Sequence, residues 1–285
     1  MKYIDKTAFL RKGHAITDSY LETECRIEEP NGHYHYQNVD YSGSFGTTKK
    51  GAKAQMLQLA VRSQENLCCY CMRSLGEGEN VTLEHVIPQS CCPEDFKRYT
   101  DLNVSPLTEK EVIRTADFTG VDDIKTDRRP HTVTFENLTA SCGGKFPDKG
   151  GSSICCNNKR GEKPIYPMFY IAEVEDELDY MDDGSVYPNE RCSHPKEYVE
   201  TIQHVRLNCS SLKDIRRLWH LFRSVPYEKI EACLLDKALR EETLLSVLFQ
   251  NPELGDQDMK ISYKFMTSDD SWRTLLLYRW FHQRI

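Results

Sequence analysis

The spacing of apolar residues predicts a helix over residues 51–66. Met56, Leu59, Ala60 and Ser63 recur at intervals of three and four residues. With 3.6 residues per turn, this spacing puts them on one helix face, which packs against the rest of a domain. The predicted helix delivers the chain to a group of cysteines that begins at residue 68.

A strand is predicted between Asn80 and Pro88, where the pattern changes to period two. Apolar and polar residues alternate there, so neighbouring side chains point to opposite faces of the strand. Glu84 and His85 are adjacent and therefore lie on opposite faces near the end of the strand. Pro88 follows, and a proline cannot continue the hydrogen-bonded ladder.

Three more elements are predicted before residue 165. They are a short helix near Pro93–Thr100, a second short strand over Thr132–Asn137, and a helix that starts near Asn157 and stops at Pro164. The order around the cysteines is therefore strand, loop, strand, helix.

Helical periodicity dominates the last third of the chain. The apolar positions Leu212, Ile215, Leu218, Trp219 and Phe222 follow the helical template closely. Shorter apolar stripes over residues 198–205, 230–248 and 272–279 predict further helices, and we interpret all of these stripes as core.

These patterns predict the α+β class and divide the chain into three parts. Residues 1–50 are polar and irregular, residues 51–165 hold the cysteines and the mixed elements, and residues 166–285 are mainly helical. The middle part is expected to carry the chemistry, because the acid–histidine pair lies between its cysteine groups.

The composition is that of a folded chain with a mild negative charge. Hydrophobic residues make up 39% of the 285 residues, which is enough to form a core. The formal net charge of −7 counts against generic nucleic-acid binding, which usually needs a basic surface. A local basic cluster is expected near the cysteines, from Lys145, Lys149, Lys159, Arg160 and Lys163.

The 12 cysteines are expected to be reduced, because the sequence predicts a cytoplasmic protein. Its first residues do not resemble a signal peptide, and no stretch approaches the roughly 20 apolar residues that span a bilayer, so no membrane partner is expected. Clustered thiols in a reducing compartment indicate metal ligands rather than disulfides.

A structural Zn²⁺ site is the first candidate for these thiols. Cys68 and Cys71 form a C-x-x-C knuckle, which directs two thiolates at one tetrahedral ion. The second pair is assigned to Cys142 and Cys156, with Cys155 as the alternative to Cys156. Four thiolates fill the coordination shell, so this metal would have no open position for catalysis.

The acid–histidine pair has the chemistry for phosphodiester hydrolysis. His85, with an ordinary pKa near ~6.5, can accept a proton from water near neutral pH. Glu84 can hold Mg²⁺ or Mn²⁺, which prefer oxygen ligands, and an asparagine from the following helix can complete that site. Asn137 is expected to brace the loop that orients His85.

This order of residues resembles the HNH endonucleases, whose core is a ββα-metal module often supported by a four-cysteine zinc. The matching residues are Cys68, Cys71, Glu84, His85, Asn137, Leu138, Cys142, Cys156, Asn157 and Asn158. The resemblance implies His85 as general base, Glu84 as ligand of the catalytic metal and Asn137 as the middle asparagine. Asn157 and Asn158 both fit as the last metal ligand.

A weaker resemblance covers roughly residues 50–225. The helix leading into the first knuckle, Ser141–Gly144 and the segment Thr201–Asn208 look like the HNH subunit of Septu-type and retron-associated antiphage systems (PtuB-like). That resemblance implies antiphage defence, DNA as substrate with RNA not excluded, and an ABC-type ATPase as protein partner. The alternative is a zinc-stabilised nucleic-acid-binding or adaptor module without catalysis.

Overall fold

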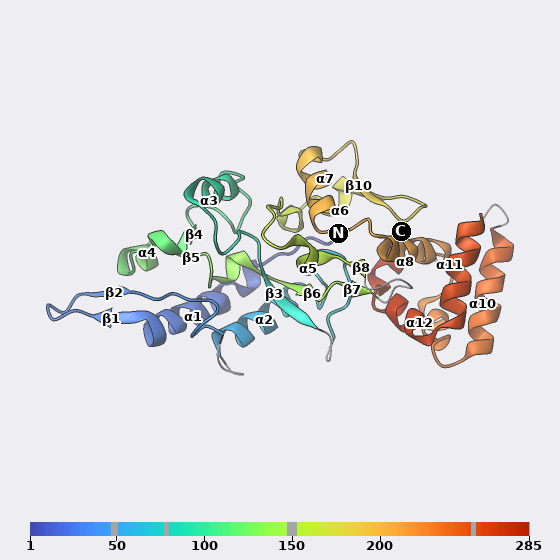
Figure 1. Cartoon of the computed structure of the whole chain (residues 1–285), viewed down its shortest axis with the longest axis horizontal. Coiled ribbons are helices and arrows are strands. Elements are labelled where there is room, and N and C mark those ends of the chain that lie inside the picture. The colour runs from blue at the N-terminus through green and yellow to red at the C-terminus, as the bar shows by residue number, and fades with distance from the viewer. Residues whose placement is uncertain (47–50, 77–79, 147–152, 252–254, 285) are drawn as a thin grey trace. The chain divides into compact units, whose positions relative to one another are not determined.

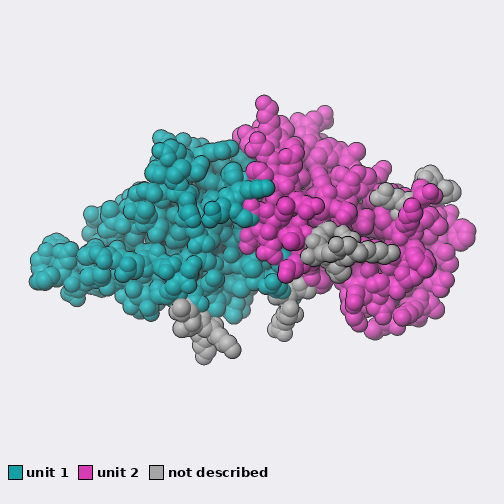
Figure 2. All heavy atoms as spheres, in the orientation of Figure 1, with its two compact units in different colours: residues 1–69, 75–143, 161–175 teal, residues 70–74, 144–160, 176–285 magenta. Residues whose placement is uncertain are grey.

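The computed structural model of the chain describes residues 1–46, 51–76, 80–146, 153–251 and 255–284. It contains both helices and short strands, as the α+β prediction requires (Figure 1). The chain divides into two compact units, residues 1–69, 75–143 and 161–175, and residues 70–74, 144–160 and 176–285 (Figure 2).

The first unit combines helices with three two-stranded sheets. Its helices are α1 (Leu10–Tyr20), α2 (Ala52–Ser63), α3 (Pro93–Thr100) and α4 (Val121–Lys125). Its strands are β1 (Arg26–Glu28), β2 (Tyr34–Tyr36), β3 (Val81–His85), β4 (Val112–Ile113), β5 (Arg129–Pro130) and β6 (Leu138–Cys142). The strands pair as β1–β2, β3–β6 and β4–β5, of which only the last pair is parallel.

The second unit is mainly helical. Helix α6 (Val174–Glu177) spans the point in the sequence, between residues 175 and 176, where the chain passes from the first unit to the second. Two small hairpins pair β7 (Lys145–Phe146) with β8 (Ser153–Ile154) and β9 (Leu178–Tyr180) with β10 (Val186–Pro188). The helices are α5 (Cys156–Arg160), α7 (Pro195–His204), α8 (Ser210–Leu221), α9 (Tyr227–Ala232), α10 (Lys237–Gln250), α11 (Asp256–Thr267) and α12 (Asp269–Leu276).

Two helices predicted from the sequence are confirmed. In α2 the buried residues are Met56, Leu59, Ala60 and Ser63, the face that the spacing indicated. This face packs against β3 and β6. The short helix α3 starts at Pro93, and the thiol of Cys92 caps it by accepting the Asp95 N–H. Proline at the first turn and a capping side chain are typical of a helix start.

The first strand is confirmed as β3, but the second starts six residues and ends five residues after its predicted bounds. The strand β6 covers Leu138–Cys142, whereas Phe135–Asn137 forms a 3-10 turn. The apolar alternation at Val133 and Phe135 arises because both side chains are buried beside this turn, and not because they belong to a strand. The β3–β6 register places Glu84 opposite Thr139 and His85 opposite Leu138.

The expectation of an irregular segment over residues 1–50 is wrong, because α1 lies within it. The buried residues of this helix are Gly13, Thr17 and Tyr20, of which only Tyr20 is large, so the sequence shows no stripe of large apolar residues on the packed face. Gly13 faces Phe135 so closely that a Cβ at Gly13 would lie 2.3 Å from the Cβ of Phe135. Thr17 then donates from Oγ1 to the Val133 carbonyl at 3.0 Å. As a result, α1 rests directly against the turn that precedes β6.

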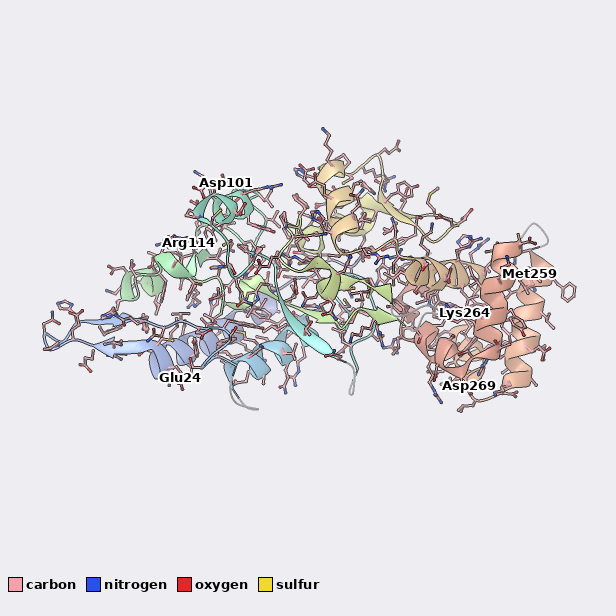
Figure 3. The ribbon with its side chains drawn as sticks, in the orientation of Figure 1. Glu24, Asp101, Arg114, Met259, Lys264 and Asp269 are labelled. Atoms are coloured by element: carbon pink, nitrogen blue, oxygen red, sulfur yellow. The ribbon has the colours of Figure 1, made fainter. Side chains whose placement is uncertain are left out.

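Helix α8 buries the residues that helical periodicity selected, whereas Leu245, within the predicted stripe over residues 230–248, is exposed. On α8 the side chains of Leu212, Ile215, Leu218 and Trp219 are all buried. A buried arginine also holds this region together, because Arg240 donates to the carbonyls of Cys233 and Leu234 and to Asp269 at 2.9 Å. Asp269 begins α12 and is labelled in Figure 3.

Candidate functional site

Four cysteines form the clearest ligand group in the described part of the chain. The sulfur atoms of Cys68, Cys71, Cys142 and Cys156 lie within 4.8 Å of one another, and all four residues are buried. A tetrahedral zinc with Zn–S bonds near 2.3 Å separates its sulfurs by about 3.8 Å. The geometry and the all-thiol donor set therefore fit a structural zinc, with the four ligands that the sequence predicted.

Backbone and hydroxyl groups hold these sulfurs in place. The backbone N–H of Cys142 donates to the sulfur of Cys68 at 3.4 Å, and the sulfur of Cys71 lies 3.7 Å from the Tyr278 hydroxyl. Gly144 has a φ of +61°, and a Cβ there would lie 2.0 Å from the Cys155 carbonyl oxygen. Only glycine can therefore bring the chain this close to the cysteine pair.

The alternative ligand Cys155 and the adjacent pair Cys91 and Cys92 fall outside this group. Cys155 has its sulfur 3.2 Å from that of Cys156, yet Cys156 is the member of the four-sulfur group. Cys91 contacts the ring of His131 with its sulfur at 3.6 Å, and Cys92 is exposed and caps α3. The two adjacent cysteines at 91 and 92 therefore have contacts of their own outside the metal group.

Glu84 and His85 end β3 as two buried polar residues. Their relative exposures are 5% and 7%, which is low for a carboxylate and an imidazole. The Nε2 atom of His85 lies 2.8 Å from the Thr132 carbonyl oxygen. A carbonyl only accepts hydrogen bonds, so Nε2 carries a proton, and Nδ1 is the nitrogen that can gain or lose one.

The side chain of Asn137 ties together the backbone around this histidine. Its Oδ1 accepts the Ile87 N–H at 2.7 Å, and its Nδ2 donates to the carbonyls of Ile87 at 3.0 Å and His131 at 2.8 Å. Ile87 lies two residues after His85. His131 directly precedes Thr132, whose carbonyl accepts the hydrogen bond from His85. The amide therefore fixes the chain on both sides of the imidazole.

His131 is a second buried imidazole beside this clamp. Its Nδ1 accepts the Thr115 N–H at 2.9 Å, and its Nε2 donates to the Pro88 carbonyl at 3.2 Å. Burial lowers its pKa to about 4, so the ring is neutral at physiological pH. This role could not be predicted from the sequence, because His131 stands in no motif.

A buried lysine supports the turn that carries Asn137. Lys6 is 3% exposed, and its ammonium donates to the carbonyls of Phe135, Glu136 at 3.3 Å and Leu138 at 2.6 Å. These carbonyls lie on both sides of Asn137 along the chain. The amino group of Lys6, from the N-terminal segment, thus positions the backbone of the turn.

The carboxylate of Glu136 also holds the turn that carries Asn137. It is buried and pairs with His14 of α1 and with the Thr134 hydroxyl. Burial opposes ionisation, but the hydrogen bond from His14 prevails and keeps the pKa of Glu136 below its usual value. Lys6 and His14 were missed in the sequence because they lie more than 100 residues before the turn and show no motif.

The two candidate asparagines lie at the start of α5. Asn157 is half-buried and Asn158 is exposed, so both have polar surface. Arg160 ends the same helix but is 2% exposed and donates to the Tyr70 hydroxyl at 3.3 Å, so it does not contribute to a basic surface. Lys145, Lys159 and Lys163 are exposed, and Lys149 lies outside the described residues.

Comparison with known proteins gave no relative. No protein-family model matches the chain, and no curated protein matches it.

None of the described helices has the length and apolar character that crossing a bilayer requires.

Proposed function

We propose that the chain is a metal-dependent HNH endonuclease that hydrolyses phosphodiester bonds of DNA at Glu84 and His85. The observation that supports this most is the arrangement around His85. Its Nε2 proton is committed to the Thr132 carbonyl, and Asn137 holds both flanking segments in place. A neutral imidazole with a fixed tautomer suits a general base.

In the proposed reaction, Nδ1 of His85 accepts a proton from the attacking water. The buried Glu84 carboxylate and the side-chain oxygen of Asn157 or Asn158 would hold Mg²⁺ or Mn²⁺, whose preferred ligands are oxygens. That ion supplies positive charge at the phosphate and at the leaving oxygen. Asn137 keeps its role in the backbone and touches no substrate.

The four cysteines would hold Zn²⁺ as a structural ion in the ββα-metal module. The thiolate shell leaves the zinc no open position, so the zinc takes no part in the cleavage. It would link Cys68 to Cys156, which lie 88 positions apart in the sequence.

The biological setting rests on the family resemblance alone. By that resemblance we propose antiphage defence in the cytoplasm, DNA as substrate with RNA as a second possibility, and an ABC-type ATPase as partner. The isolated chain would then cut slowly, and the partner would accelerate it.

Cleavage of supercoiled plasmid with Mn²⁺ or Mg²⁺ tests the proposal. The wild-type chain should cut, while His85→Ala and an EDTA control should not. His33→Ala is the matched control, because His33 is an exposed histidine of the same unit. If plasmid is retained on the protein but stays intact, with and without an ATPase partner, the non-catalytic binding module is the better account.

A further inference from the structure

Tyr41, in the N-terminal segment, lies directly against the candidate base. The ring of Tyr41 meets the ring of His85 edge to face, with 4.3 Å between centroids. The ammonium of Lys53 lies over the same tyrosine ring, 4.3 Å from its centroid. Lys53, Tyr41 and His85 therefore form a continuous row within the first unit.

Packing fixes the position of Tyr41 in this row. Tyr41 is 7% exposed, and Phe45, which is fully buried, packs on it with 5.6 Å between ring centroids. The Phe45 carbonyl also accepts the backbone N–H of Lys53 at 3.1 Å, which ties the first turn of α2 to the Tyr41–Phe45 turn. The tyrosine ring is thus held rigidly between the helix and His85.

The hydroxyl of Tyr41 remains neutral in this setting. Burial raises its pKa, and the negative charge of Glu84 raises it further. Tyr41 therefore interacts with both members of the acid–histidine pair. Its ring contacts the ring of His85, and its hydroxyl is affected by the charge of Glu84.

Lys53 brings a positive charge within reach of a substrate at His85. Because each of the two distances is 4.3 Å, its ammonium lies no farther than about 8.6 Å from the imidazole centroid. A path from the imidazole to the ammonium through water, phosphorus and a non-bridging oxygen uses two hydrogen bonds of about 2.8 Å, a reacting contact of about 3 Å and one P–O bond. Such a path fits within this limit when it bends at the water and at the phosphorus.

The charge of Lys53 is also available for an anion. Lys53 is half-buried, so part of its surface faces solvent, and it forms no ion pair with any residue that the structure describes. A lysine ammonium is a compact charge that suits a phosphate oxygen.

We propose that Lys53, held over the ring of Tyr41, binds a non-bridging oxygen of the phosphodiester that is cleaved at His85. Tyr41 is then a positioning residue that sets the distance between the ammonium and the base. This inference rests on the proposed nuclease function. It extends the site to residues that precede the first zinc knuckle.

Two matched measurements test this role. The first is cleavage of a DNA duplex by Lys53→Ala, Lys53→Arg and the control Lys125→Ala, which removes an exposed lysine of α4. Loss of one charge-assisted contact should lower kcat/KM by about 10-fold to 100-fold in Lys53→Ala. Lys53→Arg should recover most of the rate, and the control should match wild type. Tyr41→Phe keeps the ring and should be near wild type, whereas Tyr41→Leu should behave like Lys53→Ala.

The second measurement needs no cleavage. In the His85→Ala background, binding of the same duplex is followed by fluorescence anisotropy over a range of salt concentrations. Removal of one phosphate contact should reduce the slope of log K against log salt by about 0.9. Thermal melting of each variant shows whether it is folded.

The outcomes separate this inference from the nuclease proposal. If Lys53→Ala matches Lys125→Ala in both rate and salt slope while wild type cuts DNA, the role of Lys53 is wrong and the nuclease stands. If wild type binds DNA without cutting it, the salt slope alone decides for or against Lys53. If wild type neither cuts nor binds DNA, both proposals fall together.

Discussion

Replacing Asn137 with alanine should destabilise the first unit substantially. The side chain is fully buried and makes three hydrogen bonds, to Ile87 N–H, Ile87 O and His131 O. Each such bond contributes about 1 kcal/mol net, so their loss costs roughly 3 kcal/mol of unfolding free energy. The backbone groups left behind are buried without partners, which makes this loss difficult to relieve.

Asn137→Asp separates the hydrogen-bonding argument from simple loss of volume. The aspartate keeps an acceptor for the Ile87 N–H, but it puts a carboxylate oxygen where Nδ2 now donates to two carbonyls. Repulsion among these oxygens should make Asn137→Asp less stable than Asn137→Ala at neutral pH by roughly 1–3 kcal/mol. The difference should shrink at lower pH, as protonation removes the charge.

Urea unfolding of wild type and both variants measures these effects, with an unchanged m-value as the check for comparable states. Asn158→Ala on α5 is the matched control, because Asn158 is exposed. The reasoning is refuted if the unfolding free energy of Asn137→Ala lies within about 0.5 kcal/mol of the wild-type value, which is the usual effect of a surface substitution. It is equally refuted if Asn137→Asp proves more stable than Asn137→Ala.

Three further predictions concern the support of the site. Burial lowers the pKa of Lys6 from 10.5 to about 7. Between pH 7 and pH 10.5 the unfolded chain therefore binds more protons than the folded chain. The unfolding free energy should rise with pH in this range, by up to about 1.4 kcal/mol per pH unit. Lys6→Met should flatten this rise in urea titrations at several pH values, and an unchanged slope would contradict it. Metal analysis should find one zinc per chain, lost in Cys156→Ser and kept in Cys155→Ser; the reverse result would reassign the ligand. Gly13→Ala should lower the melting temperature because its Cβ would collide with Phe135, and an unaltered melt would show that α1 can shift.

Elements with a strong pattern of their own could be predicted from the sequence. The apolar stripe of α2 and the alternation in β3 specify those elements locally, and the structure has both. The second strand was misplaced because Val133 and Phe135 imitate strand alternation while their burial comes from α1 and the turn. Helix α1 buries Gly13, Thr17 and Tyr20, so its packed face holds a single large residue and no stripe of large apolar side chains.

The ligands of the metal group could be predicted for a similar reason. The C-x-x-C spacing of Cys68 and Cys71 indicates metal ligands. For the second pair the sequence left Cys155 open beside Cys156, and the four-sulfur group contains Cys156. The groups that support the turn at Asn137 leave no such trace. Lys6 and His14 act through single long-range contacts, and a lone lysine or histidine near the N-terminus has the appearance of a surface residue.

Chemical rescue of the base tests the central claim most directly. In the plasmid assay with Mn²⁺, His85→Gly should lose cleavage, and added imidazole should restore part of it by taking the place of the missing ring. His33→Gly, with its exposed histidine removed, should cut like wild type with or without imidazole. Rescue of His85→Gly alone is the predicted result. If His85→Gly cleaves plasmid at the wild-type rate without imidazole, the assignment of His85 as the base is contradicted.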